Sequence, residues 1–208
     1  QKKEQKKGLM QKLLTGEVRL PGFEGKWKKV KLKEISVCLD NLRKPINSKE
    51  REKMKGNIPY YGANGIVDYV NDYLFDEPLI LMAEDGGHFN EFRDRPIAMK
   101  IEGKAWVNNH AHVLRIINSD HDFVYYSLVH KDIRKYINGS TRGKLTQSDM
   151  LAIELILPDS IEEQKAISHI LMKIDLNIEL LERELNELKC QKKGLMQLLL
   201  TGKVRVKV

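Results

Sequence analysis

Three short polar segments carry the side chains that are best suited to chemistry with a partner molecule. The first, NIPYYGANGIVDYV, places Tyr60 and Tyr61 before a Gly-Ala-Asn-Gly turn that contains Asn64. Aromatic rings stack on nucleobases, and an amide hydrogen-bonds base edges. We therefore expect Tyr60, Tyr61 and Asn64 to contact bases; the alternative is that the tyrosines are ordinary strand residues.

The second and third segments add polar and basic groups. MAEDGGHFNEFRDR contains His88, Asn90 and Arg93, and we expect the first two at base edges and the arginine at phosphates or bases. NGSTRGKLTQSD places Arg142 and Lys144 between glycines, next to hydroxyls and backbone N–H groups, in a short loop suited to clamping a phosphate.

The charge of the chain agrees with a polyanionic partner. Its 208 residues carry a formal net charge of +7, which favours nucleic acid but also suits an anionic membrane or solubility alone. The cations expected to engage phosphates are Arg43, Lys44, Lys49, Arg51, Lys53, Arg142 and Lys144.

An enzymatic interpretation rests on His110 and His112, which would lie on one face of a strand and could bind a metal together with Glu84. This set would suit a metal-dependent nuclease. No third ligand has motif-like spacing, and the sequence contains no GxSxG, Walker, HExxH or adenine-methylation motif. We therefore expect no catalytic residue, no metal and no cofactor.

The C-terminal third predicts one long helix. Ser160 and Glu163 form a capping-box pattern at its start, and Thr201-Gly202 ends it, about 40 residues later. Its apolar residues recur at alternating spacings of four and three, which is a coiled-coil seam. We expect the seam to meet a partner helix, the alternative being packing on its own domain; its members are Ile167, Leu171, Ile174, Ile178, Leu181, Leu185 and Leu188.

The end of this helix is repeated at the start of the chain. QKKGLMQKLLTGEVRL begins at Gln5 and QKKGLMQLLLTGKVRV begins at Gln191, and the two agree at thirteen of sixteen positions. The spacing of 186 residues is far longer than a solenoid repeat. We infer that residues 1–16 are the tail of an equivalent helix, which we expect to pack beside the C-terminal end of the long one.

The intervening sequence predicts a strand-rich domain. LILMA, HVLRII and AIELILP read as strands, and apolar spacing between Asp122 and Ile137 predicts a helix. The fold class is therefore α+β, with a helical tail at 1–16, a strand-rich domain at 17–158, a long helix at 159–202 and a basic tail at 203–208. No membrane span or disulfide framework is evident, and two distant cysteines favour a reducing cytoplasm.

The chain resembles the specificity subunits of type I restriction-modification systems. The resemblance rests on WKKVKLKEI, YYGANGIVDYV, WVNNHAHVL, LTQSDMLAIELILPDSIEEQKAISHIL and KKGLMQLLLTG, in that order. Members of this family normally hold two target recognition domains, each followed by a long helix, and their helices pair antiparallel. This chain contains one such domain, its helix and the end of a preceding helix.

The resemblance implies a non-catalytic subunit that reads one half of a bipartite target in double-stranded DNA. The family's adenine methyltransferase (M) subunits and restriction and motor (R) subunit would supply the chemistry. From the exposed seam we expect an antiparallel homodimer, and a coiled-coil scaffold that binds protein is the other alternative to DNA recognition.

Overall fold

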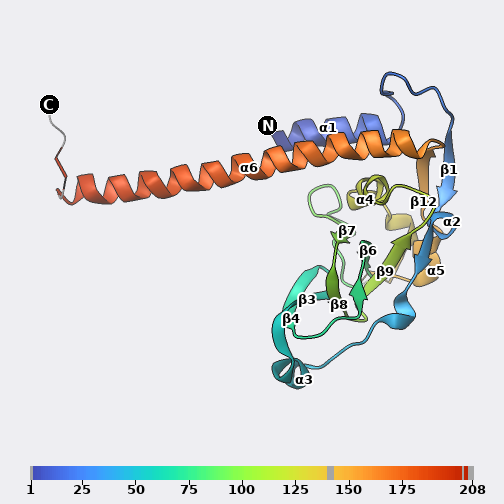
Figure 1. Cartoon of the computed structure of the whole chain (residues 1–208), viewed down its shortest axis with the longest axis horizontal. Coiled ribbons are helices and arrows are strands. Elements are labelled where there is room, and N and C mark those ends of the chain that lie inside the picture. Colours follow the sequence, from blue (N-terminus) through green and yellow to red (C-terminus); the bar gives the residue numbers. More distant parts are fainter. Residues whose placement is uncertain (1, 140–142, 203, 206–208) are drawn as a thin grey trace.

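A long helix extends away from a small domain that consists of strands and short helices (Figure 1). The computed structural model describes residues 2–139, 143–202 and 204–205. Helix α6 (Ile161–Leu200) has 40 residues, which confirms its predicted length. The Ser160 hydroxyl accepts a hydrogen bond from the Glu163 amide at 3.2 Å, and Gly202 follows the helix with a φ of +69°, where glycine is favoured.

The predicted capping box is only half formed. The Glu163 carboxylate does not turn back to the helix start; it accepts hydrogen bonds from Arg19 Nε at 2.7 Å and Nη2 at 2.9 Å. The neighbouring Gln164 is also buried, donating to the Pro158 carbonyl and accepting from the Asp120 amide. Both polar side chains therefore fix the base of α6 to the domain, because buried polar groups need partners.

Two four-stranded sheets form the centre of the domain. The first has the order β2-β9-β6-β7, with the strands Ser36–Cys38, Ala111–Ile116, Leu79–Ala83 and Ala98–Ile101. The second has the order β4-β3-β8-β5, with the strands Gly65–Val70, Lys55–Gly62, Lys104–Val107 and Phe75–Asp76. This mixture of sheets and helices confirms the α+β class.

Strand β6 explains why LILMA has no polar residue. Ile80 and Met82 pack in the cluster that includes residues of α4 (His121–Val129) and α6, whereas Leu79 and Leu81 pack in a second cluster with β5, β8 and β9. Alternate side chains point to opposite faces, and here both faces are covered. All five residues of β6 are consequently buried.

The chain enters and leaves the domain through a two-stranded antiparallel sheet. β1 (Trp27–Lys31) pairs with β12 (Glu154–Pro158), so the start of the domain lies beside the start of α6. Smaller elements complete the frame. They are α2 (Leu32–Ile35), η1 (Asp40–Leu42), α3 (Ser48–Lys53), η2 (Arg134–Tyr136), β10 (Ile137–Asn138), β11 (Lys144–Leu145) and α5 (Gln147–Leu151).

The helix predicted between Asp122 and Ile137 is too long. Helix α4 covers only His121–Val129, with the Asp120 side chain capping the Phe123 amide at 2.8 Å. Ile133 lies beyond the helix but is fully buried in the same core. Ile133 thus keeps the helical spacing of apolar residues although it reaches the core from a loop. A periodic pattern in the sequence cannot distinguish this arrangement from a longer helix.

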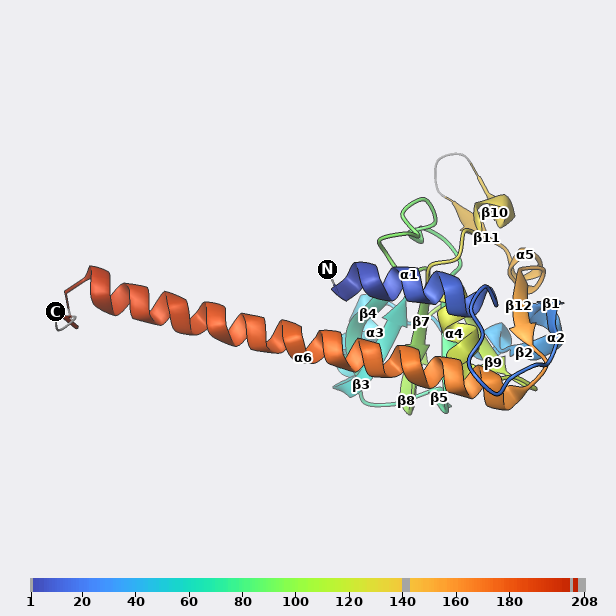
Figure 2. The ribbon, with the colours of Figure 1, turned by 90° about the horizontal axis from the view of Figure 1, so that it is seen from above.

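The N-terminal segment is helical, as inferred, but it packs against a different part of α6 than expected. Helix α1 (Lys2–Leu14) runs antiparallel beside the first half of α6, not beside its C-terminal end (Figures 1 and 2). Lys3 pairs with Glu182 at 2.6 Å, and Lys6 pairs with Asp175. These two pairs set the register of the helices.

The predicted seam is divided between two environments. Ile167 and Leu171 are fully buried in the domain core, and Ile174 and Ile178 are half-buried next to α1. Leu181, Leu185 and Leu188 are 43%, 50% and 53% exposed. Packing on its own domain therefore accounts for the first part of the seam only. In the described part of the chain, no helix combines the length and apolarity needed to cross a membrane.

Candidate nucleic-acid interface

The three polar segments meet in space. Asn64 Nδ2 donates to the Gly86 carbonyl at 3.0 Å, and the Gly86 amide donates to the Gly143 carbonyl at 3.2 Å. The Leu145 amide also donates to the Glu84 carbonyl at 2.8 Å. We call residues 62–65, 84–95 and 143–145 the loop face. In Figure 2, β10 and β11 lie on the same side of the domain as the green loop between β6 and β7.

An ion-pair network supports the loop face from below. Arg43 Nη1 lies 2.9 Å from Glu84 Oε2 and donates to the Ala111 carbonyl at 2.8 Å. Lys144 Nζ lies 3.4 Å from the other Glu84 oxygen. The Arg43 side chain is only 13% exposed, so its guanidinium is engaged within the domain. Lys144, in contrast, is 55% exposed and available to a ligand.

A buried histidine ties β9 to the third loop. His112 is 2% exposed, with Nδ1 2.6 Å from Asp40 Oδ2 and Nε2 2.8 Å from the Leu145 carbonyl. Burial acts to raise the pKa of the Asp40 carboxyl, but hydrogen bonds from His112 and the Val113 amide outweigh it and hold the pKa below its ordinary value. His112 therefore positions the loop from inside the domain.

The proposed nuclease residues do not converge. His110 lies 3.2 Å from Asp85, His112 faces Asp40, and Glu84 faces Arg43. Within the described ranges, the grouping with metal-ligand spacing is a different one, formed by Cys38, Asp40 and His112.

That grouping is poorly suited to a cation. Both Asp40 oxygens already accept hydrogen bonds, and the Arg43 guanidinium lies 3.3 Å from one of them. Burial raises the pKa of the Cys38 thiol to about 11, so the thiolate that would bind a metal is disfavoured. We interpret Cys38, Asp40 and His112 as a structural cluster.

The two adjacent tyrosines have different environments. Tyr60 is 2% exposed, packs with Val70 and Trp106, and carries the Arg51 guanidinium 5.1 Å from its ring centre. Arg51 in turn pairs with Asp68 at 3.1 Å. Tyr60 and Arg51 therefore act as frame residues in this structure, and only Tyr61, which is half-buried, still presents part of its ring to solvent.

Several exposed side chains remain for a ligand. Asn64, Asn90 and Arg93 are exposed on the loop face, and His88 is half-buried. Lys44, Lys49 and Lys53 are exposed on and before α3. Arg142 lies outside the described residues.

Sequence reasoning missed other exposed groups on the β3–β4 hairpin. Val67 is 60% exposed and Tyr69 is 48% exposed, and Tyr73 lies nearby with the Lys104 ammonium 4.5 Å from its ring centre. The alternation of GIVDYV indicates a strand with one solvent face, but it does not show which side chains of that face remain exposed.

Comparisons with known proteins agree on one family. Residues 24–190 match the model for the type I restriction modification DNA specificity domain. The chain is 37% identical over 140 residues to a putative type I restriction enzyme specificity subunit of Haemophilus influenzae, covering 67% of this chain and 34% of the relative. It is 42% identical over 90 residues to a putative MjaX specificity subunit of Methanocaldococcus jannaschii, covering 42% of this chain and 21% of the relative.

Solved structures show the same fold. A type I S subunit from M. genitalium superposes with a TM-score of 0.71 at 18% identity, covering 94% of this chain and 53% of that one. The HsdS subunit from Thermoanaerobacter tengcongensis gives a TM-score of 0.56 at 16% identity, covering 95% and 52%. This chain thus spans about half of each solved subunit. By its sequence match, it belongs to the family of type I restriction-modification DNA specificity domains.

Proposed function

We propose that this chain reads one half of a bipartite DNA target through the loop face. The observation that carries the proposal is the convergence of three polar segments from distant parts of the chain, held together by the Asn64 side-chain amide and by backbone hydrogen bonds. A rigid frame that presents amides, an imidazole and cations at one surface can both position DNA and read base edges.

The exposed residues divide into two roles. Lys44, Lys49, Lys53, Arg93 and Lys144 engage phosphates, which fixes the duplex but carries no sequence information. Tyr61, Asn64, His88 and Asn90 contact bases. Asn64 uses one Nδ2 hydrogen to hold Gly86, so its Oδ1 and its second Nδ2 hydrogen are left for a base edge.

Three residues that the sequence assigns to direct DNA contact have a supporting role in this proposal, and a fourth residue stays a direct contact. Arg43, Arg51 and Tyr60 act indirectly, because their polar atoms are engaged in the frame that carries the loops. Their substitution would disturb the loop face as a whole. Arg142 remains a predicted phosphate contact.

The chemistry on DNA belongs to other subunits in this proposal. An adenine methyltransferase and a restriction and motor subunit dock on the protein, which itself contributes no catalytic group. One of the similar solved chains comes from a study of complex assembly and conformational transition in a type I system, and it is 18% identical.

The exposed apolar stripe of α6, which runs from Leu181 through Leu185 and Leu188 toward the end of the helix, pairs antiparallel with the same stripe of a second copy. In the single chain these leucines are exposed to water, which is unfavourable for a helix with one apolar face. Two recognition domains would then lie at opposite ends of a helix pair, and the DNA target would be a split palindrome.

Fluorescence anisotropy with labelled duplex DNA, without other subunits, tests the DNA proposal. We expect binding that weakens steeply with salt, a loss with Lys144→Ala, and no loss with Lys29→Ala, an exposed lysine on β1 that serves as the matched control. Binding that is insensitive to salt and to Lys144→Ala would instead favour the protein-binding scaffold.

A further inference from the structure

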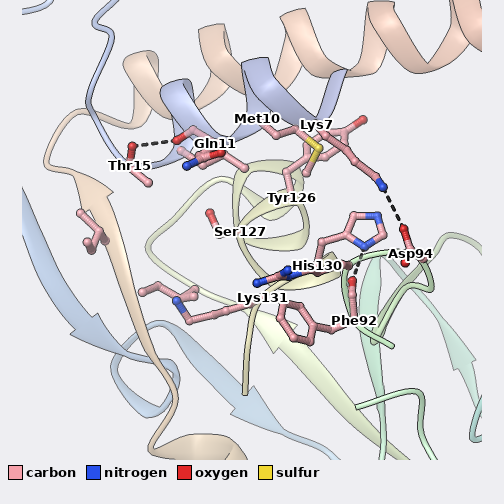
Figure 3. Close-up of a pocket in the computed structure, with 14 residues that line it drawn as sticks. Lys7, Met10, Gln11, Thr15, Phe92, Asp94, Tyr126, Ser127, His130 and Lys131 are labelled. Carbon is pink, nitrogen blue, oxygen red and sulfur yellow. Dashed lines mark hydrogen bonds and ion pairs between the residues drawn. The ribbon is translucent and has the colours of Figure 1, made fainter. Parts of the chain in front are cut away.

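Helix α1 lies against the domain, next to α4, the Phe92 loop and the first half of α6 (Figure 3). We call the surface that α1 covers its seat. Met10 and Leu13 are buried in the main core cluster, and Lys7 Nζ lies 2.9 Å from Asp94 Oδ1. A cavity remains between this segment, α4 and the Phe92 loop. From the N-terminal segment it is lined by Lys7, Met10, Gln11, Leu14 and Thr15.

All five of these residues recur at the end of α6. Their counterparts, 186 positions later, are Lys193, Met196, Gln197, Leu200 and Thr201. The buried Leu13 also has an identical counterpart, Leu199. Within the helical part of the repeat, the copies differ where Lys12 is replaced by Leu198, and Lys12 is exposed in α1. The residues that contact the seat are therefore those that the two segments share.

The C-terminal copy already has the conformation of the seated one. The Val18 amide donates to the Lys12 carbonyl at 3.2 Å, and the Val204 amide donates to the Leu198 carbonyl at 3.2 Å. Gly16 and Gly202 follow their helices with φ values of +74° and +69°. Yet Met196 and Leu199 are 47% and 45% exposed, so the second copy is formed but not docked.

We propose that the C-terminal end of α6, residues 189–202, from a second copy of this chain displaces α1 and takes its seat, reciprocally in both copies. The proposal rests on the antiparallel pairing of α6 proposed above. It adds an exchange of two nearly identical segments to that pairing.

The ion pairs of α1 give the register of the exchanged dimer. Lys3 and Lys6 correspond to Lys189 and Lys192, which would reach Glu182 and Asp175 of the other copy. The position midway between 182 and 189 and that midway between 175 and 192 both fall within two residues of Leu185. A two-fold axis at this place lets most of α6 overlap with its partner, and it covers the exposed leucines of both copies.

Exchange also explains what drives the dimer. Nearly every contact that residues 5–16 give up is remade by an identical side chain of the other copy, so the seat itself contributes little to the difference between monomer and dimer. The burial of the α6 stripe, from Leu181 onward, is then the net gain, as in domain swapping.

The mass of the full chain in solution, measured by light scattering without DNA, tests the exchange. We expect a concentration-dependent dimer for the natural sequence and a monomer for Met196→Asp/Leu199→Asp. Leu198→Asp is the matched control and should keep the dimer, because its counterpart Lys12 faces solvent in the seated copy. Circular dichroism verifies that each variant is folded.

Opposite changes in α1 should have the opposite effect. Met10→Asp/Leu13→Asp opens the seat and should lower the dimer dissociation constant at least tenfold. Two charge changes leave the apolar packing of Met10 and Leu13 in place: Lys192→Glu should weaken the dimer severalfold, and Lys6→Glu, which breaks the pair of α1 with Asp175, should strengthen it.

Two results would overturn the exchange. One is a dimer that survives Met196→Asp/Leu199→Asp but is split by Leu181→Asp/Leu185→Asp, since the stripes would then pair while α1 stays in place. The other is a chain that remains monomeric after Met10→Asp/Leu13→Asp. Because DNA is absent from the measurement, neither result bears on target reading, and a failure of DNA binding leaves the exchange untouched.

Discussion

The two halves of α6 share one heptad pattern but have opposite environments. Near the domain, Ile167 and Leu171 are fully buried, and Glu163 and Gln164 beside them are tied to the domain by hydrogen bonds. In the distal half, Leu185 and its neighbours are exposed, although their spacing is the same. A heptad pattern thus identifies which face of a helix is apolar, and the partner of that face must be established separately for each turn.

The largest contrast is expected from matched leucine truncations. Leu171→Ala should cost about 2 to 5 kcal/mol of unfolding free energy, because it leaves a cavity in the core. Leu185→Ala should change it by less than about 0.5 kcal/mol in dilute monomer, where the side chain is exposed. Urea denaturation measures both, and equal losses would mean that the two halves are not distinct environments.

Removal of an ion pair should also cost more stability at the base of α6 than in its distal half. Arg19→Ala leaves the buried Glu163 carboxylate without its partner and should cost about 1 to 3 kcal/mol. Arg183→Ala removes an i,i+4 pair with Glu179 in which both side chains are 64% exposed, a pair worth about 0.3 to 0.5 kcal/mol. If the Arg183 change were the more destabilising one in urea titrations, the base of α6 would not be the anchored half.

Alkaline pH should loosen the base of α6 in particular. Burial, and then the hydrogen bond from the Tyr126 hydroxyl to Asp175 at 2.8 Å, raise the pKa of Tyr126 above its ordinary value. A raised pKa of a group that is neutral when protonated contributes stability that is complete below about pH 10, the unfolded value, and is lost as the pH rises further. Tyr126→Phe should therefore flatten the alkaline limb of the stability profile, and an unchanged limb would assign the loss to other groups.

The smallest effect concerns a single cation of the loop face. Lys144→Ala should reduce the slope of log affinity against log salt by about 1, as expected for one phosphate contact. Leu185→Ala, in the distal half, should leave the slope unchanged at protein concentrations that keep the chain monomeric. Anisotropy titrations at several salt concentrations provide the comparison, and an equal slope for Lys144→Ala and the natural sequence would remove Lys144 from the set of phosphate contacts.

Local signals in the sequence predicted elements well where one chemical cause dominates. The Ser160 cap, the Thr201-Gly202 stop and the unbroken apolar run of β6 are each determined by neighbouring residues, and the structure confirms them. The failures involve competition over long distances. The Glu163 carboxylate binds Arg19, 144 positions earlier, in place of the capping-box contact, because a guanidinium satisfies a buried carboxylate better than a backbone amide does.

The candidate site was predictable as a set of segments but not as a geometry. The polar loops were recognisable from their residue types, whereas their meeting depends on contacts such as that between Asn64 and Gly86. Tyr60 and Tyr61 are adjacent in a strand, so one ring must point into the domain, and the packing of Val70 and Trp106 selects Tyr60. Arg43 resembles any surface cation in the sequence until Glu84 and Asp40 are placed around it.

The central claim is that the loop face selects a DNA half-site, and sequencing of duplexes retained from a random pool tests it most directly. The natural sequence should enrich one short word, and Asn64→Ala or His88→Ala should relax the choice at individual positions, by about 1 to 3 kcal/mol where Asn64 makes a bidentate contact. Lys144→Ala should lower retention without altering the word. Enrichment that is identical for the natural chain and for Asn64→Ala and His88→Ala, or no enrichment at all, would contradict the account.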